Sequence, residues 1–343
     1  MPLPHDAGSM TDRYGAGPGI GCLVIQIPCF NEADTLKGTL AALPRRLPGV
    51  QRIEWVVVDD GSSDGTADVA LQNGADEVVR LPRNQGLARA FLAGVEASLG
   101  RGADVIVNTD ADNQYDAADI PRLLQPIVAG EAQIVVGERP IADIEHFSLA
   151  KKLLQRLGST AVRRLSGTNV ADAPSGFRAM TREAALRLHV FNEYTYTLET
   201  LIQAGYRGIS VESVPVRTNA PTRESRLMGS TWGYIRRQVV TLVRIFMTYR
   251  PFKFFSVPGA FSLLAGFLVG CRFLYFYATG DGGGHVQSLI LGALLMGVGF
   301  LLVIIGLVAD LISVNRKLLE DLDWRLKRME EAARQPPDIV PRS

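Results

Sequence analysis

Residues 105–115 read Val105-Ile-Val-Asn-Thr-Asp110-Ala-Asp112-Asn-Gln114-Tyr115. The β-branched run is typical of a buried parallel strand, and it stops at two carboxylates two residues apart. Carboxylates buried side by side are costly unless a cation lies between them, and oxygen ligands suit Mg²⁺ or Mn²⁺. Gln114 adds a neutral oxygen. The stretch therefore predicts a metal site on Asp110, Asp112 and Gln114, with a plain surface turn as the alternative.

Strands and helices alternate around this stretch. We expect strands at 23–28, 55–58, 77–81, 105–108, 134–137 and 209–216, and helices at 34–43, 84–99 (capped by Asn84), 121–128 and 194–204. This order predicts an α/β fold with a mainly parallel, Rossmann-like sheet that binds ligands beyond the carboxyl ends of its strands. Polar clusters at 28–32, 59–66 and 110–114 all follow strands. We therefore expect them to line one crevice.

The second cluster suits a nucleotide. Asp59 and Asp60 can accept hydrogen bonds from a base or a ribose, and Gly61 and Gly65 allow the backbone to turn close to a ligand. The sequence has neither a Walker A loop nor a G-x-G-x-x-G motif, which disfavours kinase-like and dinucleotide-binding functions. A divalent cation beside a base-binding carboxylate suits a nucleoside diphosphate, whose phosphates the metal would neutralise.

Composition excludes other classes. The net charge of +1 gives no reason to expect a nucleic-acid partner. Cys22, Cys29 and Cys271 fall in no zinc-binding spacing, which indicates a reducing compartment without a structural metal. The first twenty residues lack the apolar core of a signal peptide, so we expect residues 1–20 to form a flexible tail.

The last third of the sequence predicts a membrane hairpin. Two apolar runs, 256–278 and 288–314, are each long enough to cross about 30 Å of hydrocarbon. Basic residues lie before the first run and after the second, and none lies in the connecting segment 279–287. The positive-inside rule then predicts that both termini and the α/β domain lie in the cytosol, at a prokaryotic plasma membrane.

The expected organisation has five parts. Residues 21–229 form the catalytic domain, 230–255 a juxtamembrane amphipathic helix, 256–314 the hairpin, and 315–343 a charged cytosolic helix with a Pro-rich end. The alternative for 230–249 is a packed helix of the soluble domain. Before the hairpin, Arg217, Arg223 and Arg226 lie in one polar loop, where forked guanidinium donors suit a lipid-borne phosphate.

Four motifs carry a resemblance to a known family. They are Pro28-x-x-Asn31-Glu32, Val58-Asp59-Asp60-Gly-Ser-x-Asp64-Gly-Thr66, Asp110-Ala-Asp112-x-Gln114 and Ser175-Gly-Phe-Arg178. In this order they resemble the family 2 glycosyltransferases of GT-A fold. Over residues 22–320 the chain is most similar to the polyprenol-phosphate glycosyltransferases, the group of dolichol-phosphate mannose synthase and undecaprenyl-phosphate glucosyltransferase. The chain departs from many relatives where they have Asn-x-Gly-Lys, because here Leu87 and then Arg89 follow Gly86.

The resemblance implies inverting transfer of a hexose from a UDP- or GDP-sugar to a polyprenol phosphate. It implies a nucleotide-sugar site made by Pro28, Asn31, Glu32, Asp59, Asp60, Asn84, Asp110, Ala111 and Asp112, with Mg²⁺ or Mn²⁺ on Asp110, Asp112 and Gln114. It places the acceptor phosphate near Arg139, Lys151 and Ser175, in addition to the polar loop that carries Arg217, Arg223 and Arg226, called the arginine loop below. A solvated basic surface is the alternative for the helix that carries Lys151.

The transfer centre itself is assigned by the same resemblance, which implies catalytic roles for Asp112, Asp172 and Arg178. Asp172 is the candidate base, or it orients the acceptor or the sugar hydroxyls, because a phosphomonoester with a second pKa of about 6 is already ionised at neutral pH. The family also implies a homo-oligomer, a tetramer. Two other functions remain open: transfer to a glycolipid or polysaccharide, and a non-catalytic nucleotide-sugar-binding membrane scaffold.

Overall fold

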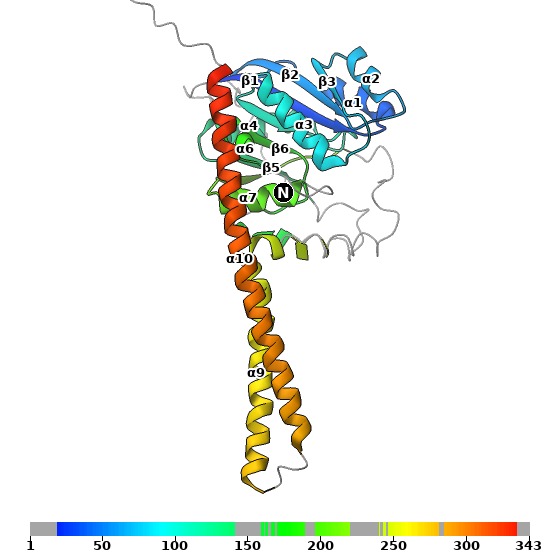
Figure 1. Cartoon of the computed structure of the whole chain (residues 1–343). Helices are drawn as coiled ribbons and strands as arrows, with labels where there is room; N and C mark the ends of the chain where they lie inside the picture. The colour runs from blue at the N-terminus through cyan, green and yellow to red at the C-terminus, as the bar shows by residue number, and fades with distance from the viewer. Residues whose placement is uncertain are drawn as a thin grey trace, which may run out of the picture. The chain divides into compact units, whose positions relative to one another are not determined.

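The computed structural model of the 343-residue chain describes residues 19–140, 159–160, 162–163, 166–168, 170–188, 196–219, 240, 243–244, 246–280 and 285–334. The chain divides into two compact units, Met1–Thr231 and Trp232–Ser343. Figure 1 shows the α/β elements of the first unit and the long helices of the second. Each unit is described by itself.

The first unit contains a seven-stranded mixed sheet. Its elements are β1 (Ile20–Cys29), α1 (Ala33–Ala42), β2 (Val50–Asp59), α2 (Thr66–Gln72), β3 (Glu77–Arg80), α3 (Leu87–Gly100), β4 (Val105–Asn108), a 3-10 turn (Ala117–Asp119), α4 (Ile120–Val128), β5 (Ile134–Glu138), β6 (Arg178–Thr181), α6 (Arg182–Arg187), α7 (Thr197–Tyr206) and β7 (Val211–Pro215). The strand order is β3-β2-β1-β4-β6-β5-β7. Only β6 runs antiparallel to its neighbours. The predicted α/β fold with a mainly parallel sheet is confirmed.

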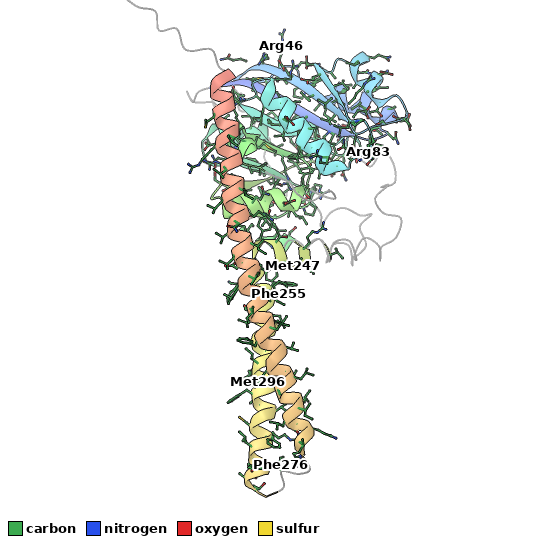
Figure 2. All side chains as sticks on the ribbon, in the orientation of Figure 1. Arg46, Arg83, Met247, Phe255, Phe276 and Met296 are labelled. Atoms are coloured by element: carbon green, nitrogen blue, oxygen red, sulfur yellow. The ribbon has the colours of Figure 1, made fainter. Side chains whose placement is uncertain are left out.

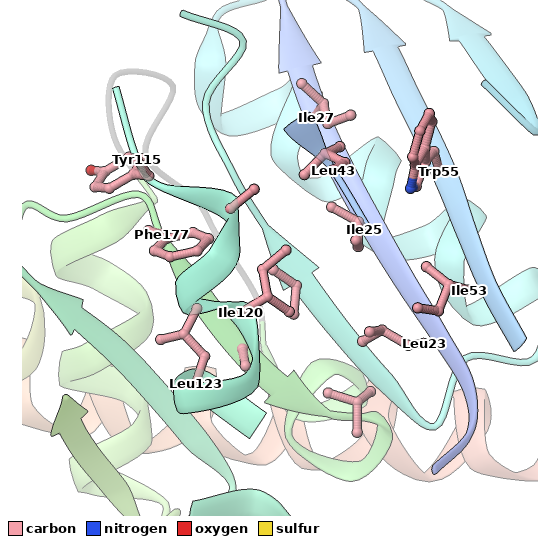
Figure 3. Close-up of a cluster of buried hydrophobic side chains, with 14 of the residues drawn as sticks. Leu23, Ile25, Ile27, Leu43, Ile53, Trp55, Tyr115, Ile120, Leu123 and Phe177 are labelled. Carbon is pink, nitrogen blue, oxygen red and sulfur yellow. The ribbon is translucent and has the colours of Figure 1, made fainter. Parts of the chain in front are cut away.

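The main core lies between one face of the sheet and helices α1, α2 and α4. Leu23, Ile25 and Ile27 alternate along β1 toward this face, and Figure 3 shows them with Trp55, Ile120 and Leu123. The residues between them, Val24 and Gln26, are equally buried. Burial on both faces is what a central parallel strand requires, and it explains the nearly continuous apolar sequence of β1.

The opposite face of the sheet is covered by α3, which packs on β1 and β2 and also contacts α6. Its buried side chains include Ala88, Phe91 and Val95, whose spacing of three and four residues places them on one side of the helix. Helices on both faces leave the carboxyl edge of the strands as the open side of the sheet.

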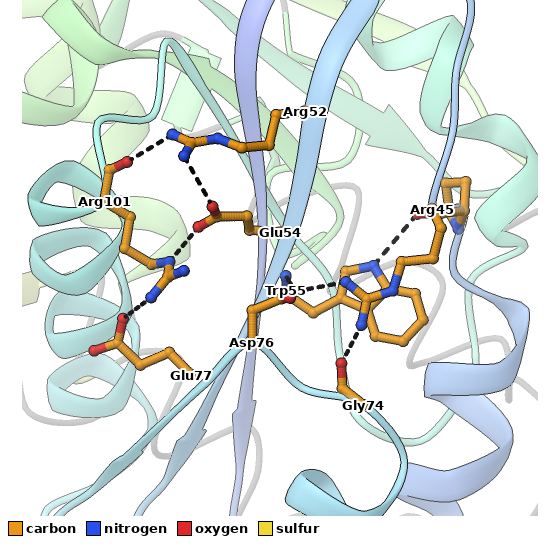
Figure 4. Close-up of polar contacts among 9 residues, drawn as sticks. Arg45, Arg52, Glu54, Trp55, Gly74, Asp76, Glu77 and Arg101 are labelled. Carbon is orange, nitrogen blue, oxygen red and sulfur yellow. Dashed lines mark hydrogen bonds and ion pairs between the residues drawn. The ribbon is translucent and has the colours of Figure 1, made fainter.

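A charged cluster joins the end of α3 to the sheet. Arg101 pairs with Glu54 on β2 and with Glu77 on β3, the latter at 3.0 Å, as Figure 4 shows. Both carboxylates lie nearer the amino ends of their strands. These ion pairs therefore stabilise the packing of α3 and leave the carboxyl edge to other residues.

The second unit contains two long antiparallel helices, α9 (Pro251–Ala278) and α10 (Val286–Arg334). Glycines permit close packing: a Cβ on Gly259 would lie 3.0 Å from the carbonyl oxygen of Gly299. Ser262 also donates a hydrogen bond to the Leu295 carbonyl at 2.8 Å. Figure 2 shows the side chains along both helices, with Phe276 and Met296 labelled.

Both helices are long and apolar enough to cross a membrane. They differ from the expected elements in two ways. The first begins at Pro251, so residues 251–255 belong to it and not to a separate juxtamembrane helix. The second does not end at 314 but continues unbroken to Arg334. Most of the predicted helix 230–249 lies outside the described residues.

Candidate active site

The candidate site lies at the carboxyl edge of the sheet, where the strand order reverses beside β1. The chain passes from β1 to β2 on one side, whereas β4 pairs with β1 on the other. Such a switch point is where ligands bind in open α/β sheets. Because β6 is antiparallel, its first residue, Arg178, pairs with Asn108 at the end of β4. The turn at 172–177 is thereby brought to the same edge.

Acidic residues from the three strand-end clusters influence one buried thiol, that of Cys29. Burial raises the pKa of the Cys29 thiol, and the negative charges of Glu32, Asp59, Asp110 and Asp64 raise it further. The pKa of this buried thiol at the end of β1 is thus influenced by acidic side chains from all three clusters. This part of the carboxyl edge of the sheet is therefore acidic.

Asp110 is the acid of this group whose ionised form the protein environment disfavours. Burial raises its pKa to about 7, the charge of Asp112 adds to this rise, and the charges of Arg139 and Arg178 oppose it. Asp112 accepts a hydrogen bond from the Gln114 backbone N–H at 3.0 Å, and Asn113 between them has a positive φ of 55°. This tight turn places the two carboxylates of the motif side by side.

The residues at this point fit a hard divalent cation. Asp110, Asp112 and Gln114 each carry a side-chain oxygen that can act as a ligand, and a bound cation would offset both the burial and the charge of Asp112 that raise the pKa of Asp110. Within the described ranges no group of three or more His, Cys, Asp or Glu side chains could hold a metal ion. Two carboxylates completed by substrate phosphates are a usual arrangement for Mg²⁺.

The loop that carries the motif is anchored from two sides. Thr39 of α1 donates a hydrogen bond to the carbonyl of Ala111 at 2.8 Å. On the other side, the Asn219 side chain donates to the Asn113 carbonyl at 2.9 Å, and the Asn219 backbone N–H donates to the Gln114 carbonyl at 2.8 Å. Ala111, predicted in the nucleotide-sugar site, therefore has its carbonyl engaged within the protein.

The first two clusters are joined by hydrogen bonds. Asn31, with a positive φ of 54°, donates its backbone N–H to Ser62 Oγ at 2.8 Å and accepts the Ser63 N–H on its side-chain oxygen at 2.9 Å. The Glu32 backbone N–H donates to Thr66 Oγ1 at 2.9 Å. The loops after β1 and β2 consequently form one rigid wall, with Pro28 at the end of β1.

Asp59 and Asp60 differ in how their oxygens are used. Asp60 is buried and accepts backbone N–H groups from Gln85 at 2.7 Å and Gly86 at 2.8 Å, so its carboxylate holds the loop before α3. Asp59 accepts the Ser62 N–H on one oxygen at 2.9 Å. The helix after this loop begins at Leu87 with Gly86 as its N-cap, so the predicted capping role of Asn84 is wrong.

Gly176 lies close against the Asp110 carboxylate. A Cβ at this position would lie 2.7 Å from Asp110 Oδ1, so only a glycine lets the backbone approach the carboxylate this closely. Its N–H donates to the Tyr115 hydroxyl at 3.1 Å, and its carbonyl accepts from Asn108 Nδ2 at 2.8 Å. The neighbouring Ser175 side chain is fully buried.

Arg178 is held inside the protein. Its guanidinium donates to the carbonyls of Ser175 at 2.8 Å and Ala173 at 2.7 Å, and to Thr200 Oγ1 at 2.8 Å. Burial lowers its pKa, while nearby acidic groups oppose this. The side chain is 1% exposed. It thus fixes the shape of the 172–177 turn and acts on the crevice through its charge.

Arg139 and Asp172 form a buried bidentate ion pair. Arg139 Nε lies 2.6 Å from Asp172 Oδ2, and Nη2 lies 3.0 Å from Oδ1. Asp172 has no exposed side-chain surface, and that of Arg139 is 11% exposed. Sequence reasoning assigned these residues separately, one to the reaction and one to the acceptor phosphate. The structure brings them together and turns both oxygens of Asp172 toward Arg139.

The arginine loop is only partly described. Arg217 donates to Asp119 through its side chain at 2.9 Å and through its backbone N–H at 2.6 Å, and it also pairs with Asp116 at 3.0 Å. This arginine anchors the segment after β7. Lys151, Arg223 and Arg226, also predicted to bind the acceptor phosphate, lie outside the described residues.

Sequence reasoning missed a buried polar network behind the crevice. Asn108 donates to the Tyr196 hydroxyl at 2.9 Å and accepts from Gln26 Nε2 at 2.9 Å, and Tyr196 stacks on Phe91 with ring centroids 3.8 Å apart. Polar residues inside apolar runs, such as Gln26 in β1 and Asn108 in β4, were the available signal, because a buried polar group must find partners.

Comparisons with known proteins agree with this architecture. The sequence model of glycosyl transferase family 2 matches residues 24–188 of the chain. An undecaprenyl-phosphate mannosyltransferase of Micrococcus luteus is 29% identical over 229 residues, which are 64% of this chain and 91% of that protein. A polyprenol monophosphomannose synthase of Mycolicibacterium smegmatis is 30% identical over 242 residues, 67% of this chain and 89% of the relative.

Among solved structures, glucosyl-3-phosphoglycerate synthase from Mycobacterium tuberculosis in complex with Mn²⁺, UDP-glucose and phosphoglyceric acid superposes with a TM-score of 0.56. It is 22% identical in sequence, and the match covers 71% of this chain and 85% of that chain. At this identity the likeness shows a shared fold.

Proposed function

Since the chain belongs to glycosyl transferase family 2, we propose that it transfers a hexose from a UDP- or GDP-sugar to the phosphate of a polyprenol lipid, with inversion at the anomeric carbon. The observation that carries the proposal is the Asp110–Asp112 pair at the switch point of the sheet. Burial raises the pKa of Asp110, and the charge of Asp112 adds to this rise. Such a pair is suited to a cation and a diphosphate together.

The sugar nucleotide would lie between the joined loops after β1 and β2 and the turn at 172–177. On the side of the joined loops after β1 and β2, the second oxygen of Asp59 would accept a hydrogen bond from the base or the ribose, and Asn31 and Glu32 would line the same site. The diphosphate would lie at Asp110, Asp112 and Gln114. The chemistry that Mg²⁺ or Mn²⁺ supplies in such a site is neutralisation of the charge that develops on the departing diphosphate.

The acceptor phosphate would approach from the side of Arg139. An arginine has five N–H donors, and the Asp172 carboxylate takes the one on Nε and one of the two on Nη2, so Nη1 can donate to a phosphate oxygen. The ion pair with Asp172 holds the Arg139 guanidinium in place. Because the acceptor oxygen is already ionised at neutral pH, attack on the anomeric carbon requires orientation more than proton removal.

The second unit would hold the enzyme at its lipid substrate. Both α9 and α10 are long enough to span a bilayer, and large side chains such as Phe261 (69% exposed) and Phe300 (63% exposed) point outward along them. The basic residues that flank the hairpin support an orientation with both termini and the site at the cytosolic face, where nucleotide sugars are available. The acceptor names of the two relatives support the lipid phosphate.

A transfer assay tests the proposal. Purified chain in lipid nanodiscs is incubated with Mn²⁺, radiolabelled UDP- or GDP-hexoses and polyprenyl phosphate, and the lipid phase is counted. We expect lipid-linked label with at least one donor, and its loss with Asp112→Asn. A preparation that binds nucleotide but labels no polyprenyl phosphate contradicts the acceptor, and label in a neutral glycolipid or polysaccharide would replace it.

A further inference from the structure

The chain directly after β7 lies antiparallel along the end of residues 110–115, called the metal loop below. Tyr115 and Thr218 form an isolated antiparallel β-bridge. Next to this bridge the Asn219 backbone N–H donates a hydrogen bond to the Gln114 carbonyl at 2.8 Å. The backbone that follows the last strand of the sheet is therefore paired with the backbone of the metal loop.

The Asn219 side chain adds two further contacts to the metal loop. Its amide Nδ2 donates to the Asn113 carbonyl at 2.9 Å and to the Tyr115 carbonyl at 3.4 Å. Together with its backbone N–H, this one residue donates to three consecutive carbonyls of the metal loop. The residue in the middle of the three is Gln114, whose side chain is a candidate metal ligand.

The metal loop has an unusual backbone conformation at its centre. Asn113 has a φ of 55°, in the left-handed region that residues other than glycine seldom adopt, although asparagine tolerates it better than most. The Asp112 carboxylate accepts the Gln114 N–H at 3.0 Å and closes a turn over this residue. The turn thus uses an N–H group of the loop, and Asn219 supplies donors to its carbonyls.

Asn219 is itself held through Arg217, two residues earlier in the chain. The Arg217 backbone N–H donates to Asp119 Oδ2 at 2.6 Å, and its guanidinium donates to Asp119 Oδ1 at 2.9 Å. The Arg217 carbonyl accepts the Asp116 N–H at 3.2 Å. Asp119 is buried at the end of the 3-10 turn that precedes α4. The segment that carries Asn219 therefore has a fixed attachment to the α/β unit.

We propose that Asn219 is a positioning residue for the cation, because its three hydrogen bonds hold Asp112 and Gln114 in the arrangement that binds a hard divalent ion. This role rests on the proposed function through the cation alone, and on neither the sugar nor the acceptor. Asn219 lies beyond residues 24–188, the part of the chain that the family model matches. Removing a group that holds metal ligands in place typically lowers metal affinity by about 10–100-fold. Without Asn219, the binding of the cation itself must order the loop.

Mn²⁺ binding to the full-length chain in nanodiscs tests this role. Calorimetric titration with Mn²⁺, in the presence of UDP and separately of GDP, compares the parent with Asn219→Ala, which loses the side-chain donors and keeps the backbone N–H. We expect the dissociation constant for Mn²⁺ to rise about tenfold. The matched control is Asn73→Ala, which removes an amide that donates to the Val69 carbonyl at 2.7 Å at the end of α2. This control should leave the Mn²⁺ affinity unchanged.

Three further measurements separate positioning from general stability. The melting temperature without metal should fall by a similar amount in Asn219→Ala and Asn73→Ala, because each variant loses one side-chain amide that donates to the backbone. The electron paramagnetic resonance spectrum of bound Mn²⁺ should change only in Asn219→Ala, because only there do the ligands move. Asn219→Asp keeps the shape of the side chain but donates no hydrogen bond, so it should also weaken Mn²⁺ binding, although its charge alone favours a cation.

The possible outcomes distinguish this role from the proposed function. Parent-like Mn²⁺ affinity with an unchanged resonance spectrum in Asn219→Ala would overturn the positioning role and leave the proposed cation in place. An equal loss of affinity in Asn73→Ala, or tighter binding by Asn219→Asp than by the parent, would overturn it as well. A parent that binds no Mn²⁺ with either nucleotide would contradict the cation of the proposed function, and the role of Asn219 with it.

Discussion

Replacing Asp172 by asparagine separates two roles for this carboxylate. Loss of one partner from a buried ion pair costs about 3–5 kcal/mol. Asparagine keeps the size of the side chain and one oxygen for Arg139, so the loss is smaller, near the value of one charge-assisted hydrogen bond, about 1.5–3 kcal/mol. We therefore expect lower stability and a raised KM for the lipid phosphate, with KM for the nucleotide sugar nearly unchanged.

A catalytic base would behave differently. Its removal lowers kcat by about 10²–10⁴-fold and abolishes the acidic limb of the pH profile, with little effect on folding. The assay is urea unfolding together with initial rates at varied acceptor concentration. The control is the cycle with Arg139→Met, in which the two substitutions together should cost clearly less than the sum of the single ones, because they remove one shared ion pair. A variant with native stability and a hundredfold lower kcat would refute the positioning role.

Two further predictions concern Gly176, which lies against Asp110, and Arg217, which anchors the segment after β7. Gly176→Ala adds a Cβ 2.7 Å from Asp110 Oδ1, so calorimetry should show Mn²⁺ affinity in the presence of nucleotide falling by about tenfold, whereas Gly38→Ala, with no atom within 4 Å, should leave it unchanged. Arg217→Met should destabilise the chain at pH 7 in urea unfolding. Burial raises the pKa of Asp119, but the hydrogen bonds and charge of Arg217 outweigh this and hold it below its usual 3.8. A depressed pKa contributes stability above the unfolded value that is lost as pH falls through the folded value, so the difference between variant and parent should shrink below about pH 4; an undiminished difference at pH 2 would contradict this.

Much of the crevice could be predicted from the sequence because parallel strands impose it. Once Pro28, Asp59 and Asn108 are recognised as strand ends, geometry alone brings the polar residues after them to one edge. This prediction needs no information about contacts between distant segments of the chain. The two long helices of the second unit could be predicted for a similar reason, since each apolar run is long enough to cross a bilayer.

The rest depended on pairings between distant segments. Strand β6 has only four residues and inserts antiparallel between β4 and β5, so nothing in its local pattern marks it as the strand that brings Arg178 to Asn108. Arg139 and Asp172 are likewise 33 residues apart. Their residue types indicate charge chemistry, but only the folded chain decides that each is the other's partner.

The acids at the crevice can be sorted by what the protein already gives them. The carboxylate of Asp60 accepts two backbone N–H groups and that of Asp172 accepts a guanidinium, so folding satisfies both, and their removal should first cost stability. Asp110 accepts no hydrogen bond from the described residues, faces the charge of Asp112, and has a pKa raised to about 7. Arg139 and Arg178 offset this rise only in part, so the ionised form of Asp110 stabilises the structure little, and a cation or ligand that favours this form gains the difference when it binds. The same sequence feature, an aspartate after a strand, thus supports structure at one position and function at another, and the difference lies in the donors that the fold supplies.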